Sequence, residues 1–220
     1  MQGFVKYIAS KTCQPLLVRY LSSTRFYSRN GIRLEIPPTV FHPGFFHSTK
    51  LLLRYLSKQH LYERSFLELG AGSGLLSMYA AKNRATVTAI DINREAIRFL
   101  QKNSDSNGVQ LKIIHSDLFA SVAAQCFDII VINPPYYKKA PQSERDHAWY
   151  CGEKGEFFQE LFAQLNNYMH PASLVLMVLC DGCDLTMIHE YAKSHSFSLK
   201  KIITQRSLIE TNYIFKIEKV

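Results

Sequence analysis

The stretch Phe66-Leu67-Glu68-Leu69-Gly70-Ala71-Gly72-Ser73-Gly74 decides the fold of this 220-residue chain. Its apolar first half, with Ser65, predicts a strand, and the apolar residues from Leu75 to Ala81 predict a helix. The three glycines between them allow a tight turn and let a ligand approach the backbone closely. A strand, a glycine turn and a helix in this order predict an α/β sheet with a binding site at the turn.

The spacing of the glycines separates two kinds of nucleotide site. A dinucleotide fingerprint needs its third glycine at position 75, which is Leu here. The G-x-G-x-G spacing therefore favours the form found in methyltransferases, which bind S-adenosyl-L-methionine, over an NAD site. The next apolar run, Thr86 to Ile90, ends at Asp91. We expect the Asp91 carboxylate to accept hydrogen bonds from both ribose hydroxyls of an adenosyl group.

A second motif, Asn133-Pro134-Pro135-Tyr136, ends the apolar run that begins at Phe127. Such a run is typical of a parallel strand covered on both faces, and ligands of open α/β sheets bind at the carboxyl ends of the strands. The two prolines lack backbone donors, so the Asn133 side chain and the Pro134 carbonyl remain as acceptors. Two acceptors suit the two N–H groups of a planar amide or aromatic amine, and Tyr136 offers a ring for a flat group. The motif predicts methyl transfer to a planar nitrogen.

The rest of the chain alternates between strand and helix patterns, which predicts a mainly parallel, seven-stranded sheet with helices on both faces. Strands are expected near 65–69, 86–90, 110–115, 127–132, 173–180, 197–204 and 211–217, and helices near 74–83, 93–104, 117–124, 155–169 and 184–194. No helical pattern separates the last two strands, so they should form an antiparallel hairpin. Upstream we expect basic helices over residues 1–30 broken near Pro15, an edge strand from Gly31 to Ile36, and a helix capped by Ser48.

The composition, 47% hydrophobic and 20% charged, is that of a globular chain with one sizeable domain. The longest strongly apolar run, Ala172 to Cys180, is too short to cross a bilayer, so no membrane segment is expected. Five cysteines without a regular pattern suggest a reducing compartment, and we expect a cytoplasmic protein. Neither a redox nor a zinc role is expected for the pair in Cys180-Asp181-Gly182-Cys183, because no second cysteine pair or histidine cluster completes a tetrahedral site, and no metal is predicted.

The net charge of +8 is concentrated at the N-terminus. No acidic residue precedes Glu35, whereas six basic residues do: Lys6, Lys11, Arg19, Arg25, Arg29 and Arg33. Such a segment suits binding to RNA or to the ribosome, and it equally suits a solvated face. It also has the acid-free, arginine-rich character of a mitochondrial transit peptide. We divide the chain into this basic extension with its lead-in loop, residues 1–47, and a catalytic domain, residues 48–220.

With these residues in place, the chain resembles the class I, Rossmann-like methyltransferases. Within them it resembles the small-domain group that includes HemK/PrmC-type protein glutamine N5-methyltransferases and several RNA base methyltransferases. Ser116-Asp117-Leu118-Phe119 and Phe127 to Tyr136 carry most of the likeness, and Ala148 to Gly155 is similar to the Gly-Gly-x-x-Gly region of that family. The resemblance implies the following cofactor contacts: Glu68, Gly70, Ala71, Gly72, Ser73, Gly74, Asp91, Asp117, Leu118 and Asn133. It implies that Asn133, Pro134, Pro135 and Tyr136 receive the substrate amide.

The sequence departs from the HemK pattern in two places. Pro43 to Lys50 keeps only the Pro and the Thr of the Arg-Pro-x-Thr-Glu segment, and a short basic extension replaces the helical domain that engages release factors. The expected substrate is therefore a protein glutamine, with a translation release factor as precedent, or an amine of an rRNA or tRNA base (N6 of adenine or N2 of guanine). A non-catalytic cofactor-binding subunit is the third interpretation. The residues Lys138, Lys139, Arg145 and His147 are either substrate contacts or solvated loop charges.

Overall fold

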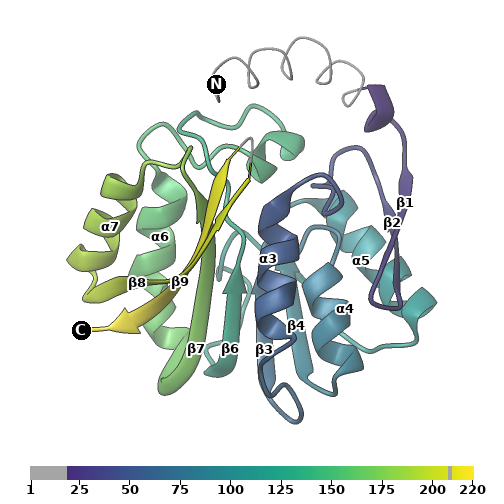
Figure 1. Cartoon of the computed structure of the whole chain (residues 1–220), viewed down its shortest axis with the longest axis horizontal. Coiled ribbons are helices and arrows are strands. Elements are labelled where there is room, and N and C mark those ends of the chain that lie inside the picture. The colour runs from purple at the N-terminus through teal and green to yellow at the C-terminus, as the bar shows by residue number, and fades with distance from the viewer. Residues whose placement is uncertain (1–18, 208–209) are drawn as a thin grey trace.

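The computed structural model describes residues 19–207 and 210–220 (Figure 1). The basic helices expected around Pro15 lie outside these residues. The main sheet has seven strands in the order β5-β4-β3-β6-β7-β9-β8. Its strands are β3 (Ser65–Leu69), β4 (Thr86–Asp91), β5 (Lys112–His115), β6 (Phe127–Ile132), β7 (Met169–Cys180), β8 (Phe197–Arg206) and β9 (Thr211–Lys219). β3 to β7 pair in parallel, while β9 is antiparallel to both β7 and β8, so the predicted sheet and its terminal hairpin are confirmed.

Helices cover both faces of the sheet, as the alternation predicts (Figure 1). The helices are α3 (His47–Leu56), α4 (Leu75–Lys82), α5 (Arg94–Asn107), α6 (Glu156–Leu165) and α7 (Leu185–Ser194), with 3-10 turns at Glu144–Ala148 and Asn166–Tyr168. Neighbouring residues of a strand point to opposite faces. Phe66 of β3 accordingly packs with α3, α4 and α5, whereas Leu67 and Leu69 pack with α6 and α7. Both faces of the central strands are therefore buried, which explains their continuous apolar runs.

The helix expected over residues 117–124 is wrong. The segment consists of turns, in which the Ala120 amide donates to the Asp117 carbonyl at 3.0 Å and the Ser121 amide donates to the Ser116 hydroxyl at 2.9 Å. Leu118 has a φ of 43°, which no right-handed helix contains. The apolar residues that suggested a helix, Leu118, Phe119 and Val122, are instead buried from these turns in the cluster that also contains α6.

Two upstream expectations also need correction. A helix does not continue to residue 30: β1 (Arg25–Arg29) and β2 (Ile32–Ile36) form an antiparallel hairpin that is a separate two-stranded sheet, not an edge of the main sheet. Its turn, Asn30-Gly31, has positive φ at both residues, as a type I′ hairpin requires. Ser48 is not a cap, because α3 begins at His47 with Phe46 in the cap position.

The hairpin packs on the body of the protein. Ile32, Leu34 and Ile36 belong to the same buried cluster as α3 and α4. Asn103 of α5 accepts a hydrogen bond from the Glu35 amide at 2.8 Å and donates one to the Glu35 carbonyl at 3.1 Å. The division of the chain at residue 47 stays a prediction.

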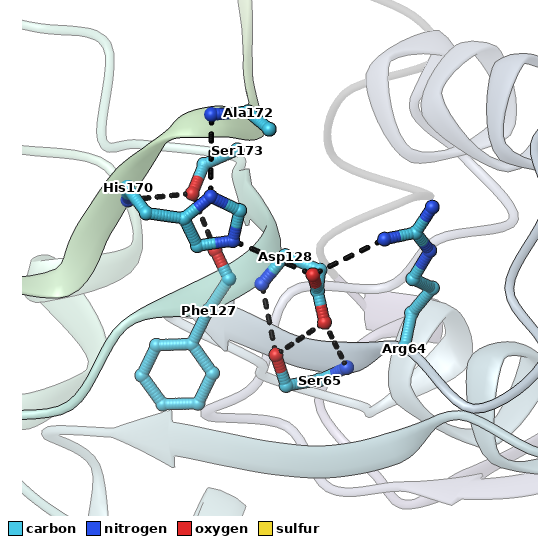
Figure 2. A network of polar contacts seen from close by, with 7 residues as sticks. All are labelled: Arg64, Ser65, Phe127, Asp128, His170, Ala172 and Ser173. Carbon is cyan, nitrogen blue, oxygen red and sulfur yellow. Dashed lines mark hydrogen bonds and ion pairs between the residues drawn. The ribbon is translucent and has the colours of Figure 1, made fainter.

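A polar network fastens the amino-terminal ends of β3, β6 and β7 (Figure 2). Asp128 of β6 accepts hydrogen bonds from the amide and the hydroxyl of Ser65, at 2.8 and 2.7 Å, and forms an ion pair with Arg64 at 3.3 Å. His170 lies 3.4 Å from the same carboxylate. At the register shift between β6 and β7, the Ser173 hydroxyl accepts from the His170 amide and donates to the Phe127 carbonyl. The network holds the sheet at the end opposite the carboxyl ends of its parallel strands.

Because of this network, part of the stability of the fold should be lost at acid pH. The Ser65 hydrogen bonds lower the pKa of Asp128 from 3.8 to about 2. A lowered carboxyl pKa stabilises the fold above the unfolded-state value, and this contribution is lost as the pH falls through the folded-state value. At neutral pH, Asp128→Asn should lower the free energy of unfolding by about 1 kcal/mol, and the difference should narrow below about pH 4. Urea unfolding across this range measures both effects.

Asp105→Asn, at an exposed carboxylate of α5, is the matched control. A deficit of Asp128→Asn that is the same at neutral pH and at pH 3, or an equal deficit in the control, would contradict the role given to Asp128.

Candidate active site

The carboxyl ends of β3, β4 and β6 surround one cavity of about 310 Å³. These strands are neighbours in the order β4-β3-β6, so the residues that follow them meet at one edge of the sheet. All of the predicted site residues except Gly74 line the cavity: Glu68, Gly70, Ala71, Gly72, Ser73, Asp91, Asp117, Leu118, Asn133, Pro134, Pro135 and Tyr136. The structure thus brings both sequence motifs to the same place.

Gly74 has a packing role instead. It precedes α4 with a φ of 80°, and a Cβ atom there would lie 2.5 Å from Leu100 Cδ2 of α5. A side chain at this position would have to displace the end of Leu100 and adopt a left-handed φ that favours glycine. The third glycine therefore suits the turn into α4, whereas Gly70 and Gly72 line the cavity.

The Asp91 carboxylate is hydrogen-bonded to the glycine turn. One carboxylate oxygen accepts a hydrogen bond from the Gly72 amide at 2.7 Å, and the other accepts one from the Asn93 amide at 2.8 Å. Burial raises the pKa of Asp91, and the two amide hydrogen bonds oppose this rise. Each oxygen keeps a second lone pair for a ligand hydroxyl. The contact with ribose stays a prediction, and the fixed orientation of the carboxylate suits it.

Glu68 is buried beneath the turn and binds the start of α4. Its carboxyl group accepts hydrogen bonds from the Ser77 amide at 2.8 Å and the Ser77 hydroxyl at 2.5 Å. Burial raises its pKa from 4.5 to about 8, and the negative charge of Asp91 contributes in the same direction. At neutral pH the group is therefore mostly protonated. A cationic ligand in the cavity would favour its ionised form.

Asn133 is held by two side chains. Its Nδ2 donates to Thr49 Oγ1 of α3 at 3.4 Å, and the Tyr136 hydroxyl donates to its Oδ1 at 2.9 Å. Burial raises the pKa of Tyr136, so the phenol stays protonated and remains a donor. These contacts fix the orientation of the Asn133 side-chain amide, with Nδ2 toward Thr49 and Oδ1 toward Tyr136. The sequence does not predict the role of Thr49, because only the fold brings α3 beside the motif.

The segment after Tyr136 is paired with the segment before α6. The amides of Tyr136 and Tyr137 both donate to the Trp149 carbonyl, at 3.0 and 2.9 Å. The Cys151 amide donates to the Tyr137 carbonyl at 2.9 Å. The two sequence regions that resemble HemK therefore form one wall of the cavity, although a dozen residues separate them.

An aromatic cluster that the sequence analysis missed lies beside the cavity. Phe41 stacks on Phe46 with ring centroids 4.2 Å apart, and Trp149 lies 5.4 Å from Phe41 and 5.1 Å from Phe46. Phe41 and Trp149 line the cavity itself. The signal in the sequence is the density of aromatic residues from Phe41 to Phe46.

The charge of the cavity wall is negative. Among the described residues, six carboxyl groups line it and no lysine or arginine does; they are Glu68, Asp91, Asp117, Glu144, Glu156 and Glu160. His147 also lies in the wall, whereas Lys138, Lys139 and Arg145 do not. No group of three or more metal-binding side chains occurs in the described part of the chain. A cavity of this size and charge fits S-adenosyl-L-methionine, whose sulfonium and ammonium groups are cationic.

Comparison with known proteins identifies the family. The family model "Methyltransferase small domain" matches residues 32–150, which span the hairpin, the glycine turn, Asp91 and the Asn133 motif. The chain belongs to this family. It is an S-adenosyl-L-methionine-dependent methyltransferase, as the glycine spacing predicts.

Curated relatives act on proteins or on RNA according to their names. A protein of Methanocaldococcus jannaschii, named "Putative protein N5-glutamine methyltransferase", is 32% identical over 66% of this chain and 74% of its own length. A release factor glutamine methyltransferase of Streptococcus pneumoniae is 33% identical over 52% of this chain and 41% of its own length. A tRNA1(Val) (adenine(37)-N6)-methyltransferase of Shewanella halifaxensis is 40% identical over 37% of this chain and 36% of its own length.

A solved structure supports the fold. The 16S rRNA N2 G1207 methyltransferase of T. thermophilus, in complex with AdoMet and guanosine, superposes with a TM-score of 0.64 at 20% identity. The match covers 90% of this chain and 50% of that chain. None of the helices within residues 19–207 and 210–220 has the length and apolar character needed to span a membrane.

Asp91 should matter for cofactor affinity. Its replacement by alanine removes a charge-assisted acceptor for the ribose, worth about 1.5–3 kcal/mol, and frees the Gly72 amide. Asp91→Ala should weaken S-adenosyl-L-methionine binding by roughly ten- to a hundredfold in calorimetry. Glu190→Ala, which removes an exposed carboxylate on α7, is the control for charge alone. Unchanged affinity in folded Asp91→Ala would remove Asp91 from the cofactor site.

The raised pKa of Glu68, about 8, gives a second prediction. The folded protein binds this proton more tightly than the unfolded chain does, so stability should fall as the pH rises from about 4.5 to about 8. Glu68→Gln has no proton to lose and keeps an acceptor for Ser77. Its melting temperature relative to the wild type should therefore increase across this range. A difference that does not change with pH would show that Glu68 is already ionised.

Proposed function

We propose that this methyltransferase methylates the side-chain amide nitrogen of a protein glutamine, with a translation release factor as the precedent among its relatives. The observation that carries the proposal is the pair of acceptors at the end of β6. The bound cofactor supplies a methyl group on a cationic sulfur, and the protein has to hold a weakly nucleophilic nitrogen in line with it.

Asn133 is suited to grip such a nitrogen. The Tyr136 hydroxyl occupies one lone pair of Asn133 Oδ1 and leaves the second for an N–H group of the substrate. None of the described residues donates a hydrogen bond to the Pro134 carbonyl, which supplies the second acceptor. An amide nitrogen is planar because its lone pair is delocalised. Holding both of its N–H groups from one side favours the pyramidal geometry in which the lone pair points at the methyl group.

The charge of the cavity favours an uncharged acceptor group. Besides the mostly protonated Glu68, five carboxyl groups and no described lysine or arginine line the wall. Such a wall stabilises a cationic cofactor and disfavours a phosphate group nearby. A glutamine side chain brings no charge into the cavity, whereas a nucleotide brings its phosphate at least to the rim. The names of the two glutamine methyltransferases among the relatives support the same substrate.

Methylation of an RNA base amine is the second candidate, and the aromatic cluster favours it. Phe41 and Trp149 line the cavity with their rings 5.4 Å apart, and a base entering there would meet aromatic faces. Lys139 lies outside the wall, 4.8 Å from the Tyr150 ring, where it is free of an acidic partner among the described residues. The basic N-terminal residues and the tRNA methyltransferase among the relatives also support this candidate.

One labelling experiment separates the candidates. The protein is incubated with methyl-labelled S-adenosyl-L-methionine in an extract of cells that lack its gene, and the extract is then divided between ribonuclease and protease treatment. Label that resists ribonuclease and is lost with protease supports the glutamine proposal. Label that is lost with ribonuclease overturns it in favour of a base.

Asn133 should be needed for methyl transfer far more than for cofactor binding. Asn133→Ala removes a preorganised acceptor that acts on the substrate nitrogen, and we expect kcat to fall by about a hundredfold or more. Cofactor affinity in calorimetry should change much less. Tyr136→Phe keeps the ring but frees Asn133 Oδ1, so its loss should be measurable and milder than that of Tyr136→Ala. Folded, cofactor-loaded Asn133→Ala with a near wild-type rate would contradict the mechanism.

A further inference from the structure

The two cysteines of Cys180-Asp181-Gly182-Cys183 lie together in a turn between β7 and α7. Their Sγ atoms are 3.8 Å apart and share a hydrogen bond, and the Cys180 amide donates to Cys183 Sγ at 3.4 Å. The Cys183 amide donates to the Cys180 carbonyl at 3.1 Å, which closes the turn. Both thiols are free. Neither sulfur has a part in the methyl transfer described above.

The surroundings of the pair favour thiol chemistry at one sulfur. The hydrogen bond from Cys183 and a second one from the Gly182 amide lower the pKa of Cys180, while sharing the proton raises the pKa of Cys183. Cys180 is buried, and Cys183 is partly exposed. Cys180 is therefore the sulfur that ionises more readily, and the Cys183 sulfur lies beside it to complete the reaction.

The turn also contacts the segment that follows the Asn133 motif. Asp184 Oδ2 forms an ion pair with Lys138 Nζ at 2.6 Å. The Tyr137 ring covers Gly182, since a Cβ atom at Gly182 would lie 3.6 Å from Tyr137 Cε1. On its other side the turn is tied to β9, where Thr211 donates to Asp181 Oδ2 at 3.1 Å. With β9 fixed, a rearrangement of the turn must act on residues 137 and 138.

We infer that Cys180 and Cys183 are a reversible redox site, which forms an intramolecular disulfide with a small disulfide oxidant and thereby shifts the substrate-binding segment. In the reaction, the Cys180 thiolate attacks one sulfur of the oxidant and displaces the other as a thiolate, which takes the proton of Cys183. The Cys183 thiolate then attacks Cys180 Sγ and displaces the second thiolate of the oxidant. The protein loses two protons and two electrons, and the oxidant is reduced to two thiols.

Closing this bond brings the two side chains of the turn closer together. A disulfide holds its sulfurs about 2.05 Å apart, so the two Sγ atoms have to approach by roughly 1.8 Å from their present 3.8 Å. Cys183 adjoins Gly182 and Asp184 in the chain, and these two residues contact Tyr137 and Lys138. Tyr137 in turn shares the Trp149 carbonyl with Tyr136. The rearrangement therefore reaches the side chain that orients Asn133.

The bond itself is tested by mass spectrometry without any substrate. A full-length protein with Cys13→Ser and Cys126→Ser is treated with oxidised glutathione, alkylated and digested. We expect a peptide that carries Cys180 and Cys183 joined together, lighter by two hydrogens, which dithiothreitol restores. Cys183→Ser in the same background should lose this product. Persistence of two alkylated thiols, or only stable glutathione adducts, would overturn the inference.

The effect on the segment is tested by the fluorescence of Trp149, the only tryptophan of the chain. Its emission should change on oxidation in the parent and stay constant in Cys183→Ser, while S-adenosyl-L-methionine affinity remains within about twofold. A disulfide without an emission change would overturn the coupling. The consequence for activity rests on the proposed function: methyl transfer should fall by about ten- to a hundredfold on oxidation. Because the first two readouts need no substrate, their failure is distinct from a failure of the proposed function.

Discussion

Two buried carboxyl groups behind the glycine turn hold the cavity in shape. Amides in a tight turn have no partner in a helix or a strand, and leaving one buried and unpaired costs about 1–3 kcal/mol. Asp91 meets the Gly72 amide and the amide of Asn93 before α5, and Glu68 meets Ser77 in the first turn of α4. Each carboxyl group thereby joins a strand end to the backbone that follows it. The unfavourable consequence is that two acids are buried, and burial raises the pKa of both.

The two ends of the parallel strands differ in role: residues at one end stabilise the sheet, and residues at the other end line the cavity. At the amino-terminal ends of β3, β6 and β7, Asp128 uses its carboxylate to fasten neighbouring strands, and its lowered pKa shows that the ionised form is favoured there (Figure 2). At the carboxyl ends, Asp91 and Glu68 stand in a wall that suits a cation. The acceptors of Asn133 lie at the same edge, because β6 is the neighbour of β3. Strand order alone therefore brings together the residues proposed to bind cofactor and substrate.

The features that depend on residues close together in the sequence could be predicted from it. Continuous apolar runs placed the seven strands, and the glycine spacing and the Asn133 motif located the cavity. Contacts between distant segments were missed: the Asn133 amide is oriented by Thr49 from α3, and the rings of Phe41 and Trp149 meet only in the fold. The apolar pattern over residues 117–124 wrongly predicted a helix, where the chain forms turns before it returns to the sheet. The Asn30-Gly31 turn was readable in principle, because that pair favours a two-residue hairpin.

The central claim is that the acceptors at the end of β6 select a planar amide nitrogen. The most direct test is to map the transferred methyl group by tandem mass spectrometry of the labelled, proteolysed product. The account predicts the methyl group on the side-chain nitrogen of a glutamine, with the carbonyl of that amide unmodified. A methyl group on a lysine amine or a carboxylate oxygen would contradict it. Neither of these groups can present the two N–H groups of a planar nitrogen to Asn133 and Pro134.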